Sequence, residues 1–369
     1  MSTIIRSVQA GANPAASTYD PTKPYNEQIR AMIRSTHSNH NAFTITPDGK
    51  RFKTEIDPNF VKWHYRQRAN DGIGTKGALH YIMGTERHGA KDAFWMVADD
   101  LIEGGYIPVS FEDHIQIQEE NAEKIFNIVG ALVALANQNG MAIVGGETAI
   151  INTLQGIEVG ISGEGYVKKG HQIIKSARPG DVIIGIESDN LHSNGYTFVR
   201  DTLLKQYGLD SKAPWCNRTV GEELTVPTRG YLPVIKELLR QFTCDSGQAA
   251  TEYASQHIHG MVHITGGGLS KLGELCPYKN VDISINRKHK LEPQEIFRFI
   301  QREFAIASEK MYTRFNNGIG YVMAVSDNAA EAALGIIRNY YPAEVIGNVT
   351  GGTGKITIES KYDSETVSF

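Results

Sequence analysis

The residues with the clearest chemical potential form one short segment, Asp71-Gly72-Ile73-Gly74-Thr75-Lys76. Its glycines let backbone N–H groups approach phosphate oxygens, Lys76 can neutralise their charge, and Asp71 can hold a magnesium ion. The same residues could instead form a glycine turn that carries a solvated lysine. Taken by itself, the segment leaves phosphate binding and a plain turn equally open.

Two further acidic segments lie downstream. Gly145-Gly146-Glu147-Thr148 directly follows the apolar run Met141–Val144, which predicts a buried strand. Ligands of open α/β proteins gather at the carboxyl ends of strands, so Glu147 is placed to meet a metal or a phosphate, with an ordinary turn acid as the alternative. Asp99-Asp100 end a predicted helix that stops before Gly104-Gly105, where adjacent acids are often only exposed charges.

Two motifs in the second half combine polar side chains with unpaired backbone amides. His192-Ser193-Asn194-Gly195-Tyr196 places an imidazole beside a predicted helix start, with Ser193 and Asn194 as N-cap residues. His263-Ile264-Thr265-Gly266-Gly267-Gly268 aims amides above the end of a predicted strand. Both suit an anion or a proton transfer, although His192 could equally be a packed, hydrogen-bonded histidine.

Two other glycine-containing segments are consistent with structural turns. Phe315–Gly320 is consistent with either a functional loop or a turn before a strand that ends near Ala324. Thr350–Lys355 resembles a phosphate loop, but no Ser or Thr follows Lys355 and strand-like residues flank it. We therefore predict a hairpin turn at Thr350–Lys355.

The elements that carry these residues alternate between apolar runs and amphipathic helices, which is typical of an α/β fold. Predicted helices cover residues 26–33, 118–137, 196–204 and 269–275, and predicted strands cover 141–144, 157–167, 182–184 and 261–264.

The chain of 369 residues is long enough for two domains. A polar, basic stretch near residues 168–179 indicates the boundary between them. We expect a divergent, proline-broken segment at 1–57, an N-terminal domain at 58–170 and a C-terminal domain at 171–369.

Composition excludes several classes of protein. The formal net charge of -4 argues against a dedicated nucleic-acid-binding protein. No apolar stretch approaches the ~20 residues of a membrane span, and Met1–Arg6 lacks the apolar core of a signal peptide. Three scattered cysteines, Cys216, Cys244 and Cys276, fit a reducing cytoplasm.

The order of the motifs resembles the aminoimidazole ribonucleotide synthetase family, also called the phosphoribosylformylglycinamidine cyclo-ligases. The motifs that carry the resemblance are DGIGTK at Asp71, ADDL at Ala98, VGGETA at Val144, HSNGY at His192, VPTR at Val226, HITGGG at His263 and MYTRFNNGIG at Met311. The resemblance implies a homodimer whose N-terminal domains pair through a mixed sheet, a C-terminal α/β sandwich domain, and ATP bound between domains.

The implied reaction is the ATP- and Mg²⁺-dependent ring closure of formylglycinamidine ribonucleotide in purine biosynthesis. By position, Asp71, Asp100 and Glu147 match the metal ligands, and the catalytic candidates are His192, Lys76 and Asn194. The nucleotide or the transferred phosphate would contact a wider set: Asp71, Gly72, Gly74, Thr75, Lys76, Asp99, Asp100, Gly145, Gly146, Glu147, Ser193, Thr265, Gly266 and Gly267.

Three departures from the family pattern leave alternatives open. Ala42–Pro47 stands where relatives carry a glycine-rich segment, Asp99 stands where they carry Asn, and Ile150–Leu154 replaces an acidic, proline-containing loop. A member with another amide or amidine substrate, or a catalytically silent partner protein, therefore remains possible. All three metal-type acids and Lys76 favour the enzyme.

Overall fold

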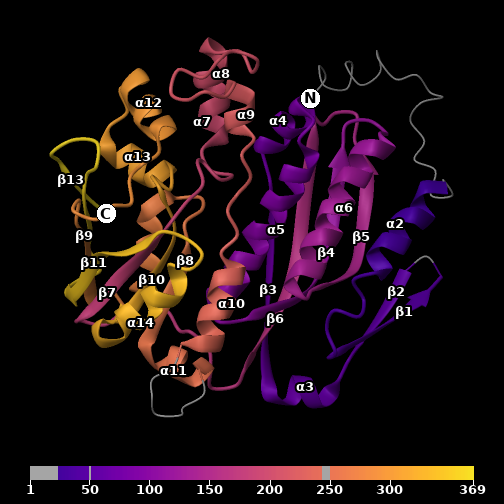
Figure 1. Cartoon of the computed structure of the whole chain (residues 1–369), viewed down its shortest axis with the longest axis horizontal. Helices are drawn as coiled ribbons and strands as arrows, with labels where there is room; N and C mark the ends of the chain where they lie inside the picture. The colour runs from indigo at the N-terminus through magenta and orange to yellow at the C-terminus, as the bar shows by residue number, and fades with distance from the viewer. Residues whose placement is uncertain (1–23, 50, 243–249) are drawn as a thin grey trace, which may run out of the picture. The chain divides into compact units, whose positions relative to one another are not determined.

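The computed structural model describes residues 24–49, 51–242 and 250–369. The first 23 residues of the predicted divergent segment, and Cys244, lie outside this range. The chain divides into two compact units (Figure 1). Unit 1 comprises residues 1–62, 68–97 and 109–164, and unit 2 comprises 63–67, 98–108 and 165–369. Asp99 and Asp100 therefore belong to unit 2, although residues 86–97 of the same helix belong to unit 1.

A four-stranded sheet of order β3-β6-β4-β5 forms the centre of unit 1. A helix joins the parallel neighbours β4 and β5, and the β1-β2 hairpin forms a separate two-stranded sheet whose β2 contacts β5. The elements are α2 (Pro24–Arg34), β1 (Phe43–Asp48), β2 (Arg51–Ile56), α3 (Pro58–Trp63), β3 (His64–Gly72), α4 (Lys76–Met83), α5 (Glu86–Ile102), β4 (Ile107–Ile117), α6 (Ala122–Asn139), β5 (Ala142–Ile150) and β6 (Ile157–Lys168).

Helix α6 confirms the clearest helix prediction. Asn121 caps its start by accepting the Lys124 N–H, and Gly140 ends it in the left-handed region at φ 71°. Its buried face includes Ile125, Ile128 and Leu132, at the spacing that the sequence predicted. On the same core, the ring of Phe94 from α5 meets Phe111 of β4 edge-on, with centroids 5.6 Å apart.

Unit 2 contains a seven-stranded sheet of order β13-β12-β9-β11-β7-β10-β8. Its elements are β7 (Asp181–Glu187), α7 (Tyr196–Asp201), α8 (Leu203–Gln206), α9 (Val220–Leu224), α10 (Leu232–Gln241), α11 (Ala250–His257), β8 (Ile258–His263), the 3₁₀ helix η1 (Gly268–Leu275), β9 (Val281–Ile285), α12 (Glu295–Glu303), α13 (Ser308–Arg314), β10 (Ile319–Ser326), α14 (Asp327–Ile337), β11 (Ala343–Gly351), β12 (Ile356–Glu359) and β13 (Thr366–Ser368).

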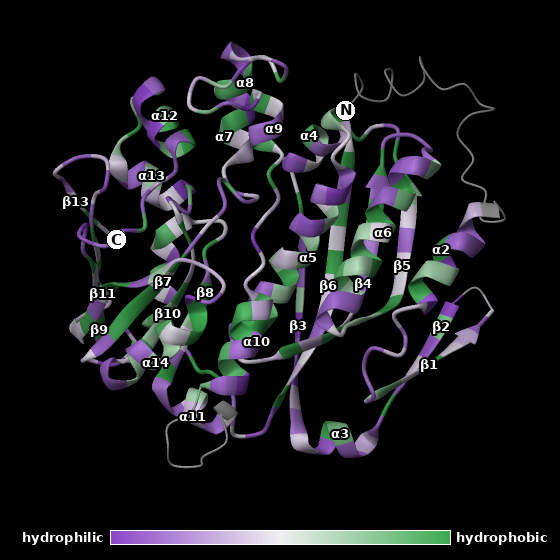
Figure 2. Ribbon diagram, viewed as in Figure 1, coloured by the Kyte–Doolittle hydropathy of each residue, from purple (hydrophilic) through white to green (hydrophobic). Residues whose placement is uncertain are grey.

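Both faces of this sheet are covered. Helix α14 packs against β7, β10 and β11, whereas η1 packs against β8 and β12. Strands buried on both faces need apolar residues at nearly every position. Strand β7 accordingly carries Val182-Ile183-Ile184 and is hydrophobic along much of its length (Figure 2). These two units confirm the expected two-domain α/β fold.

Three local predictions were wrong. The helix expected over 196–204 breaks at Thr202 into α7 and α8, and α7 begins after Gly195 in the left-handed region without a side-chain cap from Ser193 or Asn194. The strand expected to end at Val144 continues to Ile150. The turn at 352–355 is not a hairpin, because β11 and β12 lie on opposite sides of β9 and the chain crosses the end of that strand.

Candidate functional site

In unit 1, the Asp71–Lys76 segment joins the end of β3 to the start of α4. The Asp71 carboxylate accepts the Gly72 N–H at 2.7 Å, and Gly74 adopts the left-handed conformation with φ 56°. The Gly74 N–H donates to Oε1 of Glu158 on β6 at 3.1 Å. One of the amides predicted to meet phosphate is therefore bonded to a carboxylate of the same unit.

Glu158 was not predicted from the sequence, and Gly72 makes room for it. A Cβ at Gly72 would stand 2.4 Å from Glu158 Oε1. Burial raises the pKa of Glu158 and the nearby charge of Asp71 adds to this, although N–H donors from Gly74 and Ile73 oppose it. Nothing in the sequence distinguished Glu158 from Glu164, the other acid in the segment that forms β6.

Lys76 requires a correction, because the structure directs its ammonium away from any solvent-exposed phosphate site. The side chain is fully buried, and Nζ lies 3.0 and 2.9 Å from the two carboxylate oxygens of Asp92. His80 Nε2 contacts the same carboxylate at 2.7 Å. Burial alone would raise the Asp92 pKa, but Lys76 and His80 outweigh it and hold the pKa well below its ordinary value. Lys76 thus anchors the start of α4.

Glu147 also differs from its predicted setting. It lies within β5, exposed, opposite His114 of β4, rather than in a loop beyond a strand end. Asp71 and Glu147 stand on the two edge strands, with two strands between them. At about 4.8 Å per strand, their backbones are about 14 Å apart. The two carboxylates therefore do not share one ion in this arrangement.

A missed acid, Asp113, lies between these edges on the buried face of β4. Burial raises its pKa to about 7, and the charges of Glu112 and Glu147 add to the effect. Gly146 makes room for it, because a Cβ there would stand 2.6 Å from Asp113 Oδ1. The sequence analysis predicted no strand at this position, and Asp113 lies between Glu112 and His114, so no pattern marked it as buried.

In unit 2, the last turn of α5 carries the pair Asp99-Asp100. Asp99 is fully buried, and its oxygens accept the N–H groups of Tyr231 and Leu232 at 2.6–3.0 Å. It therefore caps the start of α10, which corrects its predicted role in nucleotide binding. Burial raises its pKa to about 7, despite the opposing charge of His263 and these amide donors.

Asp100 points elsewhere. Its Oδ1 lies 3.3 Å from Nδ1 of His263, and its side chain keeps 35% of its surface exposed, whereas His263 is fully buried. Burial alone would lower the His263 pKa, but the hydrogen bond to Asp100 and the charges of Asp99, Asp100 and Glu103 raise it above its ordinary value. Asp100 is thus an exposed carboxylate held by a buried ring.

His192 lies in a strained backbone conformation, with φ 56° and only 1% of its surface exposed. Its Nε2 accepts the Asp189 N–H at 3.1 Å. Asn194 donates to the Ile264 carbonyl at 3.4 Å, and Ser193 Oγ lies 3.2 Å from Thr228 Oγ1. The structure therefore brings the HSNGY and HITGGG motifs together through the contact of Asn194 with Ile264.

Two side chains outside the predicted set hold the 187–194 loop. Arg229 donates to the Glu187 carbonyl at 3.0 Å, pairs with Asp189 and stacks 4.6 Å from the ring centre of Tyr341. Asn316, fully buried, donates to the Asn190 carbonyl at 2.9 Å and accepts from Ser188. The Phe315–Gly320 segment is thus a turn that supports the His192 loop.

The three glycines of the HITGGG motif differ in why a side chain would or would not fit at their positions. Gly267 and Gly268 adopt positive φ, and a Cβ at Gly268 would meet the Tyr312 carbonyl at 2.4 Å. A Cβ at Gly266 would meet nothing within 4 Å. The Thr265 hydroxyl lies 3.0 Å from Lys271 Nζ. Only Gly266 leaves open space beside the motif.

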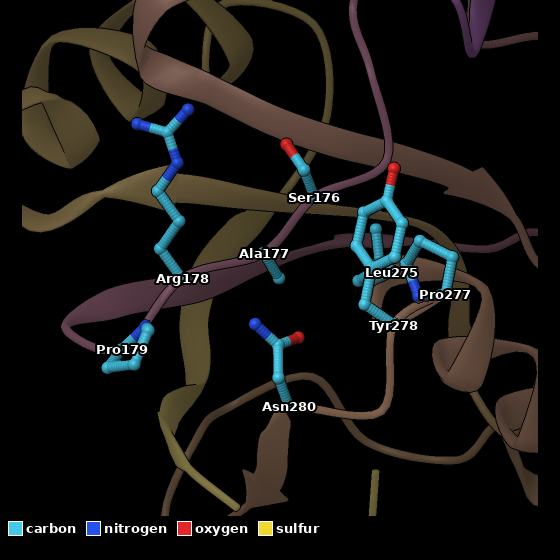
Figure 3. Close-up of a pocket in the computed structure, with 8 residues that line it drawn as sticks. All are labelled: Ser176, Ala177, Arg178, Pro179, Leu275, Pro277, Tyr278 and Asn280. Carbon is cyan, nitrogen blue, oxygen red and sulfur yellow. The ribbon is translucent and has the colours of Figure 1, made fainter.

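A surface hollow of about 200 Å³ lies elsewhere in unit 2 (Figure 3). Leu275, Pro277 and Tyr278 group on one side, and the Arg178 guanidinium points away from them (Figure 3). Its lining contains none of the predicted site residues.

Within the described ranges, no three His, Cys, Asp or Glu side chains come together in a way that could hold a metal. Nor does any helix in those ranges combine the length and apolarity needed to cross a membrane.

Comparison with known proteins places these features in a family. Residues 60–167 match the family described as AIR synthase related protein, N-terminal domain, and residues 178–359 match its C-terminal domain. The chain belongs to the AIR synthase related family. The family resemblance inferred from the motifs is thus confirmed.

Relatives in the AIR synthase related family span most of the chain. A phosphoribosylformylglycinamidine cyclo-ligase of Methanobrevibacter smithii is 33% identical over 302 residues, covering 80% of this chain and 83% of that protein. One of Thermococcus gammatolerans is 35% identical, covering 79% and 80%. The crystal structure of hydrogenase maturation protein HypE in complex with ATP matches with a TM-score of 0.62 at 15% identity, covering 94% of each chain, which supports the fold alone.

Proposed function

We propose that this chain closes the imidazole ring of formylglycinamidine ribonucleotide, using ATP and forming aminoimidazole ribonucleotide, ADP and phosphate. The observation that carries this proposal is the 33–35% identity to cyclo-ligases over about four fifths of the chain. The juxtaposed HSNGY and HITGGG motifs of unit 2 support it.

The proposed chemistry converts a poor leaving group into a good one. The γ-phosphoryl group of ATP moves to the formyl oxygen, which releases ADP. The amidine nitrogen then attacks the formyl carbon, a C–N bond forms, and the C–O bond breaks so that phosphate leaves with that oxygen. Such a reaction depends mainly on positioning and on stabilising the transferred group's charge.

His192 is the candidate for proton handling. Because its Nε2 accepts the Asp189 N–H, a neutral His192 carries its proton on Nδ1. The buried ring and its strained backbone are fixed by the loop contacts of Asn316 and Arg229. Asn194 donates to the Ile264 carbonyl and Ser193 contacts Thr228. We expect the amides of Thr265-Gly266-Gly267, which follow Ile264, to face the substrate or the transferred phosphate.

Acidic side chains in both units fit a divalent cation chemically. The pKa of Asp113 is raised mainly by burial, and the charges of Glu112 and Glu147 add a smaller increase that a nearby cation would offset. Because Asp71 and Glu147 lie too far apart to share one ion, we propose Asp71, Asp100 and Glu147 as ligands of more than one Mg²⁺ ion, with Asp113 added from the structure. When bound, Mg²⁺ would neutralise charge on the ATP phosphates.

Product formation tests this proposal. Purified protein with formylglycinamidine ribonucleotide, Mg²⁺ and ATP should yield aminoimidazole ribonucleotide, and Glu147→Gln should yield far less because it removes a charge from the proposed metal site. Equal product from wild type and a boiled control would exclude the cyclo-ligase.

Other outcomes separate the alternatives. ATP hydrolysis stimulated by a different amide or amidine would indicate an altered substrate, whereas no calorimetric binding of Mg²⁺–ATP would favour a silent partner protein. We also propose that the protein is cytoplasmic and forms a homodimer; analytical ultracentrifugation of the purified chain tests the homodimer, and cell fractionation tests the location.

A further inference from the structure

We propose that His263 is a positioning residue that holds the Asp100 carboxylate in the orientation needed to bind a nucleotide's divalent cation. The inference rests on the proposed function only in expecting that cation at Asp100. It concerns the support of the ligand, and it assigns no proton transfer to His263.

The first support is the contact itself. His263 Nδ1 lies 3.3 Å from Asp100 Oδ1. The backbone N–H of His263 donates to Glu103 Oε1 at 2.6 Å, one turn further along the same stretch of chain. Two separate bonds therefore join the end of β8 to the end of α5. They fix the ring relative to the carboxylate that it contacts.

The second support is the packing around the ring. The His263 ring lies 5.9 Å from Tyr231, 6.2 Å from Tyr321 and 6.5 Å from His192, measured between ring centres. Lys271 Nζ also donates to the His263 carbonyl at 3.0 Å. A fully buried ring held on these sides has few other rotamers, so its Nδ1 stays directed at Asp100.

The third support is the contrast in exposure between the two partners. Asp100 keeps 35% of its side-chain surface exposed, whereas His263 keeps none. Among the described residues, His263 Nε2 has no hydrogen-bond partner, so the pairing of the ring is made through Nδ1. Metal-binding side chains are commonly oriented by a buried hydrogen-bond partner on the side away from the metal, and His263 has this relation to the Asp100 carboxylate.

The same strand provides a matched control. His259 of β8 also contacts an aspartate through Nδ1, at 2.8 and 2.9 Å from the oxygens of Asp181, and both side chains are 5% exposed. Neither residue belongs to the predicted site. Loss of a buried His–Asp contact in β8 can thus be separated from loss of support for Asp100.

The experiment uses Mn²⁺ as the probe, read by electron paramagnetic resonance in the presence of ATP, with wild type, His263→Ala, His263→Asn and His259→Ala. We expect His263→Ala to weaken Mn²⁺ binding about 10- to 100-fold, as loss of a ligand's supporting partner typically does. His263→Asn retains a donor near the Nδ1 position and should recover most of the affinity. His259→Ala should bind Mn²⁺ as wild type does. Thermal unfolding verifies that each variant is folded.

Three results overturn the inference: wild-type Mn²⁺ affinity in folded His263→Ala, an equal loss in His259→Ala, or no divalent-dependent nucleotide binding in wild type. Failure of the cyclo-ligase proposal has a different signature. Wild type would then bind Mn²⁺–ATP and lose that affinity in His263→Ala, yet form no product from formylglycinamidine ribonucleotide.

Discussion

Two glycine-rich turns of this chain look alike in sequence, yet neighbouring side chains hold them differently. In Asp71–Lys76, the Gly74 N–H donates to Glu158 at 3.1 Å. In the turn after β11, the N–H groups of Thr353, Gly354 and Lys355 all donate to Asp282 Oδ1, at 2.7, 3.1 and 2.8 Å. Each turn thus has a carboxylate where a phosphate oxygen could lie.

The two carboxylates differ in how well the turn accommodates their charge. Amide donors from Thr353 and Lys355 lower the pKa of Asp282, which is therefore a well-satisfied anion. Burial raises the pKa of Glu158, which disfavours its charged form. A glycine-rich sequence therefore indicates which backbone N–H groups a ligand could reach. Whether a carboxylate of the protein already accepts those N–H groups depends on the neighbouring strands.

The largest expected effect comes from the Lys76–Asp92 ion pair, which anchors the Asp71–Lys76 turn and has no counterpart in the turn after β11. Asp92→Asn would leave the fully buried Lys76 ammonium without its charged partner. We expect a loss of about 3–5 kcal/mol in the free energy of unfolding, measured by urea denaturation. Adding Lys76→Met to Asp92→Asn removes the unpaired ammonium and leaves a polar side chain for His80 Nε2, so it should recover much of the loss. A loss in Asp92→Asn no larger than in an exposed control such as Asp201→Asn would contradict this.

The next effect compares glycine substitutions in the two turns. A Cβ at Gly352 would stand 2.0 Å from Asp282 Cγ, and one at Gly72 would stand 2.4 Å from the terminal oxygen of Glu158. Gly352→Ala must displace a carboxylate with three bonds, whereas Glu158 can shift its side-chain end. We therefore expect the thermal midpoint to fall more in Gly352→Ala than in Gly72→Ala. The reverse order would show that Glu158 is the more rigid of the two.

A smaller difference should separate removal of the two carboxylates. Asp282→Ala loses the acceptor of three amides, so its thermal midpoint should fall. Glu158→Gln keeps an oxygen for the Gly74 N–H and removes a disfavoured charge, so its midpoint should change little or rise. A clear drop in Glu158→Gln would mean that its charge stabilises the first turn.

The smallest expected effect is on the pH dependence of stability, to which Asp282 and Glu158 contribute with opposite signs. Because the folded-state pKa of Asp282 is lowered, its stabilisation is present above the unfolded pKa and is lost as pH falls through the folded value. Glu158 has a raised pKa, so its ionisation opposes folding as pH rises above the unfolded value. Urea midpoints should show Glu158→Gln losing its advantage over wild type as pH falls from about 6 to about 4, and Asp282→Asn losing its deficit only as pH falls below about 4. Changes of the same sign would contradict the assignment.

The sequence predicted the elements whose periodicity is set by local burial. Helix α6 and strands β6 and β7 follow the predicted spans closely, because their apolar spacing matches one helix face or a doubly covered strand. The end of β5 and the break at Thr202 were missed. Both depend on tertiary packing, since β5 continues past Gly145-Gly146 by pairing with β4.

For the candidate site too, the sequence predicted some features and missed those that depend on tertiary packing. The order of motifs sufficed to identify the family, whereas joint action of His192, Asn194 and the HITGGG segment stays a prediction, supported by the contact of Asn194 with Ile264. That order could not distinguish Asp99, which caps α10, from the adjacent Asp100, which His263 holds. Nor could it reveal that Lys76 is buried against Asp92, or that Glu158 and Asp113 accompany the predicted acids.

By itself, the sequence determined the type of fold, the family and the residue types available for chemistry, because these depend on composition, periodicity and motif order. Only the tertiary structure decided which charged groups are exposed and which are paired inside the protein. The physical reason is that a charge is stabilised by the donors, opposite charges and water around it, and distant segments supply those surroundings.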